Sequence, residues 1–349
     1  MRGYFVNICI GFILLAGLLQ GNWVYSLIWL VVLLPLWVIF WRRVSYHLPS
    51  FDRPGAGFWL QLWLVFARSV VLESRALWVW CFDLVLAIAS AIALGLVFFG
   101  QYYKQPLISR ITPEHSCPQL FGDEVCFFMS FPLFDPILFQ ASLSCLSLAL
   151  AAVSSSLRTF GNQRLVFKRE ATGDLSTEAF YFGRTLAHLP TCFLASLFFT
   201  LVYYAFLLPP ANIFGDLFGI FFLVYFATSG LAYCLSLLLP SGVQQLAGVL
   251  TVLSLMLFSG ANPTLAQLKD NVLIPDALFY ISYVSFFRYS QELYYLIAVD
   301  FYHPTQSTLD ILGYNTDYIG YCWVGLVVIG VLFRAIAYIV LVFQERRLR

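Results

Sequence analysis

Charged side chains are scarce in this sequence. Asp, Glu, Lys and Arg make up 11% of the 349 residues, whereas hydrophobic residues make up 61%. A soluble domain carries about 25% charged residues, so this chain lacks the polar side chains that a water-exposed surface requires. The scarcity excludes a soluble globular protein and predicts an integral, multi-pass membrane protein, in either the plasma membrane or an internal membrane. The net charge of +1 gives no reason to expect nucleic acid as a partner.

Motifs for nucleotide hydrolysis and metal binding are missing as well. No Gly-x-x-x-x-Gly-Lys-Ser/Thr segment occurs, so the backbone cradle that holds nucleotide phosphates is absent. His115, His188 and His303 are isolated and lack the spacing of metal ligands. We therefore expect no nucleotide hydrolysis by this chain alone and no metal site, and we assign no catalytic residue within the leading interpretation.

Long apolar runs occupy most of the chain. A helix that crosses a bilayer needs roughly 20 apolar residues, and a run of this length can satisfy its backbone groups internally only as a helix. No alternation typical of barrel strands is visible, so the predicted fold class is all-α and polytopic. The candidate spans are 4–20, 23–41, 77–99, 137–157, 190–209, 214–239, 243–260 and 319–343.

Basic residues indicate the topology of these spans. Most of the 19 Lys and Arg residues fall in segments 42–76, 158–189, 240–242 and 344–349. Positive charge is retained on the cytoplasmic side, so these segments are predicted to be cytoplasmic. The first run could instead be a cleaved signal sequence. Gly21-Asn22 is typical of a tight turn and favours a transmembrane hairpin over residues 1–41.

Eight cysteines are scattered along the chain, and two of them stand out. Six lie in or beside apolar spans, where small buried side chains are the plain interpretation. Cys117 and Cys126 share the loop 100–136, which the charge pattern assigns to the non-cytoplasmic side. We expect a disulfide between them in an oxidising compartment. A zinc site is the weaker alternative, because His115 is the only histidine nearby.

The segment after the hairpin divides in two. Residues 42–56 form a polar linker broken by prolines. Residues 57–75 carry Gln61, Arg68 and Arg75 at intervals of seven on an otherwise apolar helix. Such a helix lies in the membrane interface, although a simple cytoplasmic extension of the next span would have a similar pattern.

Two charged residues fall inside predicted spans. Asp83 lies in 77–99 and Arg334 in 319–343, both toward the cytoplasmic half. A charge in hydrocarbon costs several kcal/mol unless a partner masks it. We therefore predict an ion pair between Asp83 and Arg334, with a structural role in preference to proton relay.

The most informative segment is the polar island 158–189 between two apolar runs. It concentrates basic residues, includes Arg169-Glu170 and flexible Gly173, and meets a helix stop at Pro190. This pattern predicts short helices along the cytoplasmic face, on which another domain could push. Residues 261–318 are predicted to lie outside. Within them, Leu278 to Val299 is too polar to span and too aromatic for a free loop, which favours a re-entrant or surface helical pair.

One pattern points to a different class of function. His47-Leu-Pro-Ser-Phe-Asp52 has the His-x-x-x-x-Asp spacing of some membrane acyltransferases, in which Asp orients His as a general base. Pro49 interrupts the pattern, and no glycine-rich substrate block follows. Chance occurrence is the better interpretation, and a membrane-bound lipid acyltransferase that uses His47 and Asp52 is kept as the alternative.

Collinear motifs over about residues 57 to 345 carry a resemblance. The cytoplasmic block has Gln163-Arg164, Phe167, Arg169-Glu170, Gly173, Tyr181, Arg184 and Leu189-Pro190. Phe258-Ser259-Gly260, Ser285-Phe-Phe-Arg288-Tyr289 with Glu292, and Asn315 with Asp317 follow in order. This arrangement resembles the transmembrane domain of G-subfamily ABC transporters, the white/pleiotropic-drug-resistance type, and is nearest the plant and algal half-size branch.

The resemblance implies a permease domain over 57–349. Residues 57–75 would be its connecting helix, 158–189 its coupling segment and 261–318 its outer re-entrant region, which contains Arg288 and Glu292. Arg164, Arg169, Glu170 and Gly173 would couple the permease to an ATPase, with ATP and Mg bound on that partner domain or subunit. Glu170 could alternatively be an intraloop partner of Arg169 or Arg164.

The resemblance also implies two copies or related chains facing each other, surrounded by membrane lipids, and export of a lipid or other hydrophobic molecule. The pathway would be lined by residues of 137–157 and 243–260, namely Phe139, Leu143, Leu250, Leu257 and Phe258. The sequence departs from the family in having a hydrophobic hairpin where the ATPase domain would precede the connecting helix. A non-transporting regulator of a full transporter is therefore a third possibility.

Overall fold

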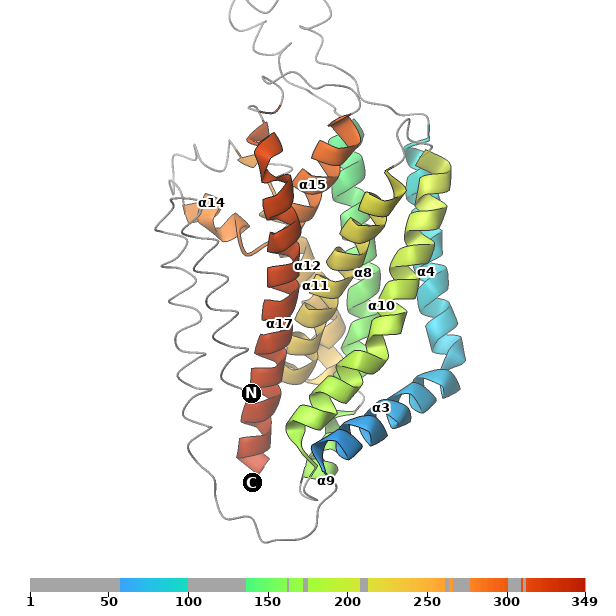
Figure 1. Cartoon of the computed structure of the whole chain (residues 1–349), viewed down its shortest axis with the longest axis vertical. Helices are drawn as coiled ribbons and strands as arrows, with labels where there is room; N and C mark the ends of the chain where they lie inside the picture. Colours follow the sequence, from blue (N-terminus) through green and yellow to red (C-terminus); the bar gives the residue numbers. More distant parts are fainter. Residues whose placement is uncertain are drawn as a thin grey trace, which may run out of the picture. The chain divides into compact units, whose positions relative to one another are not determined.

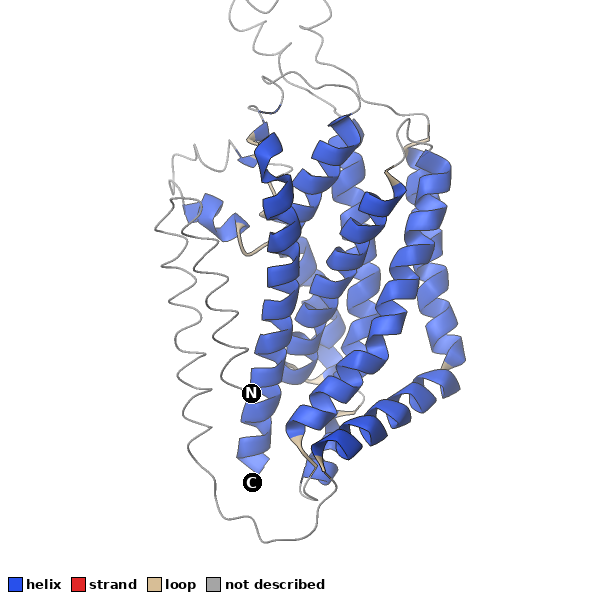
Figure 2. Ribbon diagram, viewed as in Figure 1, coloured by secondary structure: helices blue, strands red, loops and turns tan. Residues whose placement is uncertain are grey.

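The computed structural model describes residues 57–99, 136–161, 163–171, 175–207, 213–260, 264–265, 277–300, 309 and 312–348. These residues form helices joined by short turns, with no β-strand among them (Figure 2). The predicted all-α fold class is confirmed. The predicted hairpin 1–41 and linker 42–56 lie outside the described residues.

Five described helices are long and apolar enough to cross a membrane. They run alongside one another in Figure 1, with the shorter apolar helix α12 among them. Every backbone amide inside such a helix is paired within it, which is what a bilayer core demands. The helices are α4 (Leu77–Val97), α8 (Pro136–Gly161), α10 (Thr177–Leu207), α11 (Phe214–Leu238), α12 (Ser241–Leu257) and α17 (Ile319–Leu348). The chain is thus an integral, multi-pass membrane protein.

Two helices outside this set lie at one end of the bundle, which we call the basal end. Helix α3 (Phe58–Arg75) crosses obliquely against α10, and the short α9 (Arg164–Ala171) lies near its start (Figure 1). Helix α3 ends at Arg75, and the chain turns at Ala76 before α4 begins. Helix α3 is therefore a separate helix and not a straight extension of the following span.

Helix α10 corrects one expectation. Pro190 was predicted to stop a helix, but α10 continues through it from Thr177 to Leu207. Proline is tolerated inside membrane helices because neighbouring groups satisfy the carbonyl that it leaves unpaired. As a result, the second half of the polar island and the following span form one continuous helix.

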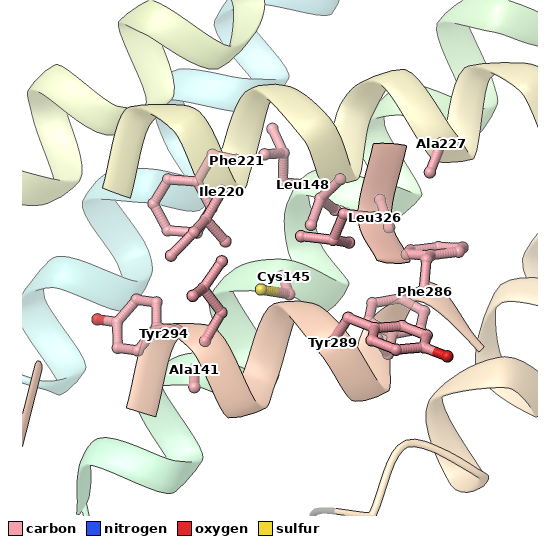
Figure 3. Packing of buried hydrophobic residues seen from close by; sticks show 14 of the residues in the cluster. Ala141, Cys145, Leu148, Ile220, Phe221, Ala227, Phe286, Tyr289, Tyr294 and Leu326 are labelled. Atoms are coloured by element: carbon pink, nitrogen blue, oxygen red, sulfur yellow. The ribbon is translucent and has the colours of Figure 1, made fainter. Parts of the chain in front are cut away.

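The main core combines small and aromatic side chains. Figure 3 shows Ala141 and Cys145 of α8 facing Phe221 of α11, together with Phe286 and Tyr294 of α15 (Phe286–Asp300). Small residues let helix backbones approach closely. Inside a bilayer the hydrophobic effect does not drive helices together, so van der Waals contacts between closely packed helices stabilise their association instead. The buried face of α8 therefore holds it against α11 and α15.

Helices α11 and α17 approach most closely at two glycines. A β-carbon added at Gly230 would lie 3.2 Å from the Gly330 carbonyl oxygen and 3.1 Å from Phe333 Cβ. Likewise, a β-carbon at Gly330 would lie 2.6 Å from the Phe226 ring. A side chain at either glycine would therefore force a neighbour on the facing helix to move.

At the outer end, opposite to the basal end, two short helices precede the last span. They are α14 (Ala277–Ser282) and α15, followed by the 3-10 turn η1 (Thr316–Tyr318) that leads into α17. The predicted helical pair is present. Helix α15 is not a surface helix, however, because most of its side chains are buried against α8, α11 and α17.

Candidate functional site

The described parts of the four segments predicted to be cytoplasmic meet at the basal end. The Arg164 Nη1 group donates to the Leu239 carbonyl at the end of α11, 3.2 Å away. The Thr177 hydroxyl donates to Glu345 near the end of α17, and Gln344 donates to the Leu237 carbonyl. These bonds tie the coupling segment to both the α11–α12 turn and the end of α17.

A second apolar core, which we call the basal cluster, lies at the same end of the bundle as these contacts. Phe160 stacks on Tyr181 with ring centroids 5.5 Å apart and meets Tyr233 edge-on at 5.0 Å. Offset and edge-to-face aromatic pairs of this kind add about 0.5–1.5 kcal/mol each beyond area burial. Helices α3, α8, α9, α10, α11 and α17 all contribute to the basal cluster, through Val65, Phe160, Phe167, Phe180, Tyr181, Tyr233, Cys234, Leu237, Ala337 and Leu341.

Phe167 attaches helix α9 to the basal cluster. Phe167 is buried and packs on Phe180 of α10 at 4.7 Å between ring centroids. Val166 and Arg169, by contrast, are exposed. Helix α9 therefore presents an outer surface while its inner aromatic residue contacts the long helix α10.

Glu170 has a partner that the sequence did not indicate. Its carboxylate forms an ion pair with Arg68 of α3, with the two side chains 31% and 36% exposed. The sequence suggested Arg164 or Arg169 of the same segment as a partner for Glu170, whereas this ion pair reaches a different helix. The Gln61 side-chain oxygen also accepts from the Ser176 backbone amide at 3.0 Å. Two of the three polar residues spaced by seven on α3 therefore contact the coupling segment.

Helix α3 also lies unusually close to α10. A β-carbon at Gly183 would lie 2.9 Å from Val65 Cγ1 and 3.2 Å from the Phe66 backbone nitrogen. The face of α3 that points away from α10 carries Trp59 and Trp63, both exposed. The polar side of α3 therefore faces protein, and its apolar side faces outward.

Buried polar groups continue from the basal cluster into the bundle. Arg184 of α10 donates from Nε and Nη2 to the Thr159 carbonyl, at 3.2 and 2.6 Å. The Tyr181 hydroxyl donates to the Arg334 carbonyl of α17 at 2.7 Å. His188 Nδ1 lies 2.8 Å from the Tyr233 hydroxyl of α11. Helix α10 is thus hydrogen-bonded to three neighbouring helices within about two turns.

Glu73 of α3 titrates in an accessible range. Burial raises the pKa of its carboxyl to about 7, and the nearby Arg184 partly opposes this shift. Between the ordinary pKa of about 4.5 and pH 7, the folded state binds a proton that the unfolded state has lost, so stability falls as pH rises through this window. We expect the thermal midpoint of the wild type to decrease from pH 5 to pH 7 relative to that of Glu73→Gln. Parallel curves for the two proteins would contradict this expectation.

The predicted intramembrane pair between Asp83 and Arg334 is wrong. Asp83 of α4 instead forms an ion pair with Arg158 of α8. Arg334 donates to the Ser229 hydroxyl at 2.7 Å and to the Phe226 carbonyl, and its guanidinium lies 3.4 Å from the Phe226 ring centre. Sequence position places both charges at a similar depth but does not determine which way each side chain points around its helix.

The outer pair of residues, Arg288 and Glu292, lies on α15. Arg288 Nη1 donates to the Ser282 hydroxyl at 2.6 Å, and its guanidinium lies 3.8 Å from the Tyr283 ring centre. Burial raises the pKa of Glu292, opposed by Arg288 and by the Asn315 amide, which donates to its carboxylate at 3.5 Å. The two residues therefore link α15 to α14 and to the turn before α17.

The residues assigned to a pathway lie on exposed surfaces of the isolated chain. Phe139 and Leu143 on α8 are exposed, as are Leu250 and Leu257 on α12, and Phe258 at the end of α12 is half-buried. Their shared exposure leaves the pathway assignment as a prediction, since an exposed apolar side chain can face lipid, a second chain or a substrate.

Several predicted residues lie outside the described part of the chain. They are Gly173 of the coupling segment, the cysteines Cys117 and Cys126, and the acyltransferase alternative His47 and Asp52. Within the described ranges, no group of three or more His, Cys, Asp or Glu residues is arranged to hold a metal ion.

Sequence reasoning missed three residues that the structure places in these contacts. The sequence marks Arg68 only as one of three polar residues spaced by seven, Arg158 only as a basic residue at the start of the polar island, and His188 only as an isolated histidine. The seven-residue spacing of the polar side chains on α3 was a usable signal for Arg68, because it predicts a single docking face. No comparable pattern pointed to Arg158 or His188.

Comparison with known proteins agrees with this geometry. The ABC-type transporter claG of Penicillium crustosum is 31% identical to the chain over 131 residues. That alignment covers 38% of this chain and 18% of the relative, so the chain spans less than a fifth of its length. The sequence profile described as ABC-2 type transporter matches residues 139–347, from the start of α8 to the end of α17. Because this match covers more than half of the chain, the chain belongs to the ABC-2 type transporter family.

Proposed function

We propose that this chain is the permease part of an ATP-driven exporter of the G-subfamily type, and that it moves a lipid or another hydrophobic molecule. ATP and Mg would bind to an ABC ATPase domain or subunit outside the described permease. The family match supports a transporter membrane component, and the name of the relative claG includes the words ABC-type transporter.

The attachment of α9 carries the proposal. This helix combines an exposed outer surface with an inner contact through Phe167 to α10 and an ion pair through Glu170 to α3. A domain that displaced α9 would therefore move both helices. Because α10 is continuous through Pro190, the displacement would extend into the membrane.

The buried hydrogen bonds suggest where the motion goes next. Tyr181 connects α10 to α17, Arg184 connects it to α8, and His188 connects it to α11. Nucleotide-driven closure of two ATPase domains would then rock these helices between inward-open and outward-open packings, each stabilised by its own contacts.

Helix α12 supports the association of two chains. Its inner face packs on α8, where a β-carbon at Gly248 would lie 2.6 Å from Val153 Cγ1. The opposite face is an exposed apolar stripe at helical spacing, made by Val243, Leu246, Leu250, Leu253 and Leu257. We propose that this stripe faces a second copy or a related chain across a substrate pathway, with Phe139 and Leu143 of α8 nearby on the same route.

The test is reconstitution of the full chain with a co-expressed ABC ATPase subunit in proteoliposomes. We expect a complex with two permease chains and ATP-dependent movement of a fluorescent lipid. A complex that binds the ATPase but never transports any of a panel of lipids would indicate the regulatory role instead. Lipid acylation that is lost in His47→Ala and Asp52→Ala would favour the acyltransferase.

A further inference from the structure

One face of α8 changes in character from the outer end to the basal end. Helices α4 and α12 both pack on α8. Helix α8 also exposes or half-exposes a row of side chains at helical spacing, consisting of Phe139, Leu143, Ser147, Leu150, Ser154 and Arg158, with half-exposed Leu146 and Ala151 beside it. The row spans about 28 Å along the helix, from a rise of about 1.5 Å per residue. It is apolar at the outer end and charged at the basal end.

The two serines of this row do not make it a polar surface. The Ser147 hydroxyl donates to the Ser144 carbonyl at 3.0 Å, and the Ser154 hydroxyl donates to the Ala151 carbonyl at 2.9 Å. Their donors are therefore used within α8 itself. Arg158 is the only charged residue in the α8 sequence, so the row has a single cationic end.

Arg158 is only partly occupied by its ion pair. Its side chain is 39% exposed, whereas that of Asp83 is 14% exposed. The pair uses Arg158 Nη2, and the other guanidinium nitrogens of Arg158 make no hydrogen bond with the described residues. A guanidinium has five N–H donors in a planar fork, so Arg158 can bind a second anion while it stays paired with Asp83.

We propose that this row binds a single-chain anionic amphiphile, with its head group on Arg158 and its alkyl chain along Leu150, Leu143 and Phe139. Guanidinium groups favour carboxylate and phosphate because two parallel N–H···O bonds form at once. The row has one cationic end and an apolar stretch that begins about two turns away, which suits one anionic head group with one alkyl chain. The inference rests on the proposed function and assigns a chemical class to its substrate.

A purely structural role for the pair is the competing explanation. An ion pair between α4 and α8 would hold the two helices together whichever helix carried the positive charge. An anion site, in contrast, needs the positive charge on the α8 row. Exchange of the two charges in Asp83→Arg/Arg158→Asp therefore separates the two roles.

The experiment measures binding of radiolabelled oleate to the full chain in phosphatidylcholine nanodiscs, with empty nanodiscs subtracted. Oleyl alcohol, which has the same chain and a neutral head, is the matched probe. We expect the charge-exchanged protein to fold and to bind oleate at least about tenfold more weakly, while its affinity for oleyl alcohol stays within about twofold of the wild type. Unchanged oleate affinity in this variant would overturn the proposal.

A second variant protects the test against misfolding. Asp83→Asn/Arg158→Gln removes both charges at similar side-chain size and leaves no unpaired ion in the membrane. It should show the same loss of oleate affinity, and full retention of that affinity would contradict the proposal. Phosphatidylserine nanodiscs address the source of the anion. If phosphatidylserine displaced all bound oleate, the occupant would be a phospholipid head group and the single-chain assignment would be wrong.

The binding experiment can fail or succeed separately from the proposed transport function. Oleate binding requires neither ATP nor an ATPase partner. Selective binding without ATP-driven transport would support the site and count against the proposed function. Transport that persists while the charge-exchanged protein binds oleate normally would reject the site alone.

Discussion

Glu170→Arg is expected to abolish most ATP-driven transport while the membrane bundle stays folded. The substitution places two positive charges at the junction of α3 and α9, where Arg68 now meets a carboxylate. An ion pair this exposed contributes only about 0–1 kcal/mol to stability, so folding should be nearly unchanged. If the junction transmits motion from the ATPase, the transport rate should fall at least about tenfold, which corresponds to ~1.4 kcal/mol.

The restoring variant makes this prediction specific. Arg68→Glu/Glu170→Arg rebuilds the pair with exchanged charges and should recover most of the transport rate in the proteoliposome assay. Asp216→Arg, on an exposed position in the first turn of α11, makes the same change of charge far along the chain and should transport normally. If the exchanged pair were as inactive as Glu170→Arg, the ion pair would not be the coupling contact.

Gly230→Leu is expected to give the largest loss of stability of any single substitution considered for this protein. Its β-carbon would meet the Gly330 carbonyl and Phe333, and the Arg334 guanidinium lies 3.2 Å away. Because one obstacle is backbone, α11 and α17 would have to separate along their crossing. Overpacking typically costs about 1–3 kcal/mol, and we expect the upper end of this range or more, with loss of monodisperse protein.

Gly215→Leu in the same helix is the matched control. No atom lies within 4 Å of a β-carbon at Gly215. Both substitutions replace glycine in a helix with a residue of higher helix propensity, since glycine is about 0.8–1.0 kcal/mol less favourable than alanine in a helix interior and leucine ranks just below alanine. Gly215→Leu should therefore be neutral or stabilising, and any large difference between the two variants arises from packing.

The readout uses the cysteines of the chain. Cys145, Cys192, Cys234 and Cys322 are free and buried in the folded bundle, whereas Cys81 is exposed. In a background in which Cys81 and the cysteines outside the described residues are replaced by Ser, a thiol-reactive fluorophore therefore reports unfolding as temperature rises. We expect a lower midpoint, or labelling before heating, in Gly230→Leu only. Equal midpoints for the two leucine variants would show that the α11–α17 crossing can widen at little cost.

The membrane-spanning helices followed from local sequence. The runs 77–99, 137–157, 190–209, 214–239 and 319–343 each correspond to one long described helix, and 243–260 corresponds to α12. Hydropathy predicts these helices correctly because each membrane-spanning segment must pair its backbone hydrogen-bonding groups within itself, whatever its neighbours are. The helix over 57–75 was predicted from the seven-residue spacing of its polar side chains, which is also a local pattern.

Partners across the bundle did not follow from sequence. Asp83 pairs with Arg158 and not with Arg334, and Glu170 pairs with Arg68 on a separate helix, which the sequence did not indicate. Pro190 lies inside a helix that it was expected to end. For the two ion pairs the deciding factor is a neighbour distant in the chain, which periodicity and composition do not identify.

The sequence by itself determined that the chain is helical and membrane-embedded, with a basic end at which several segments gather. Those properties depend on apolar length and on charge distribution, both of which are local. The tertiary structure alone decided which charges neutralise one another, that α10 is continuous from the polar island into the membrane, and that α3 is fastened to α9. These features depend on the rotation of each helix about its axis, which packing against other helices sets.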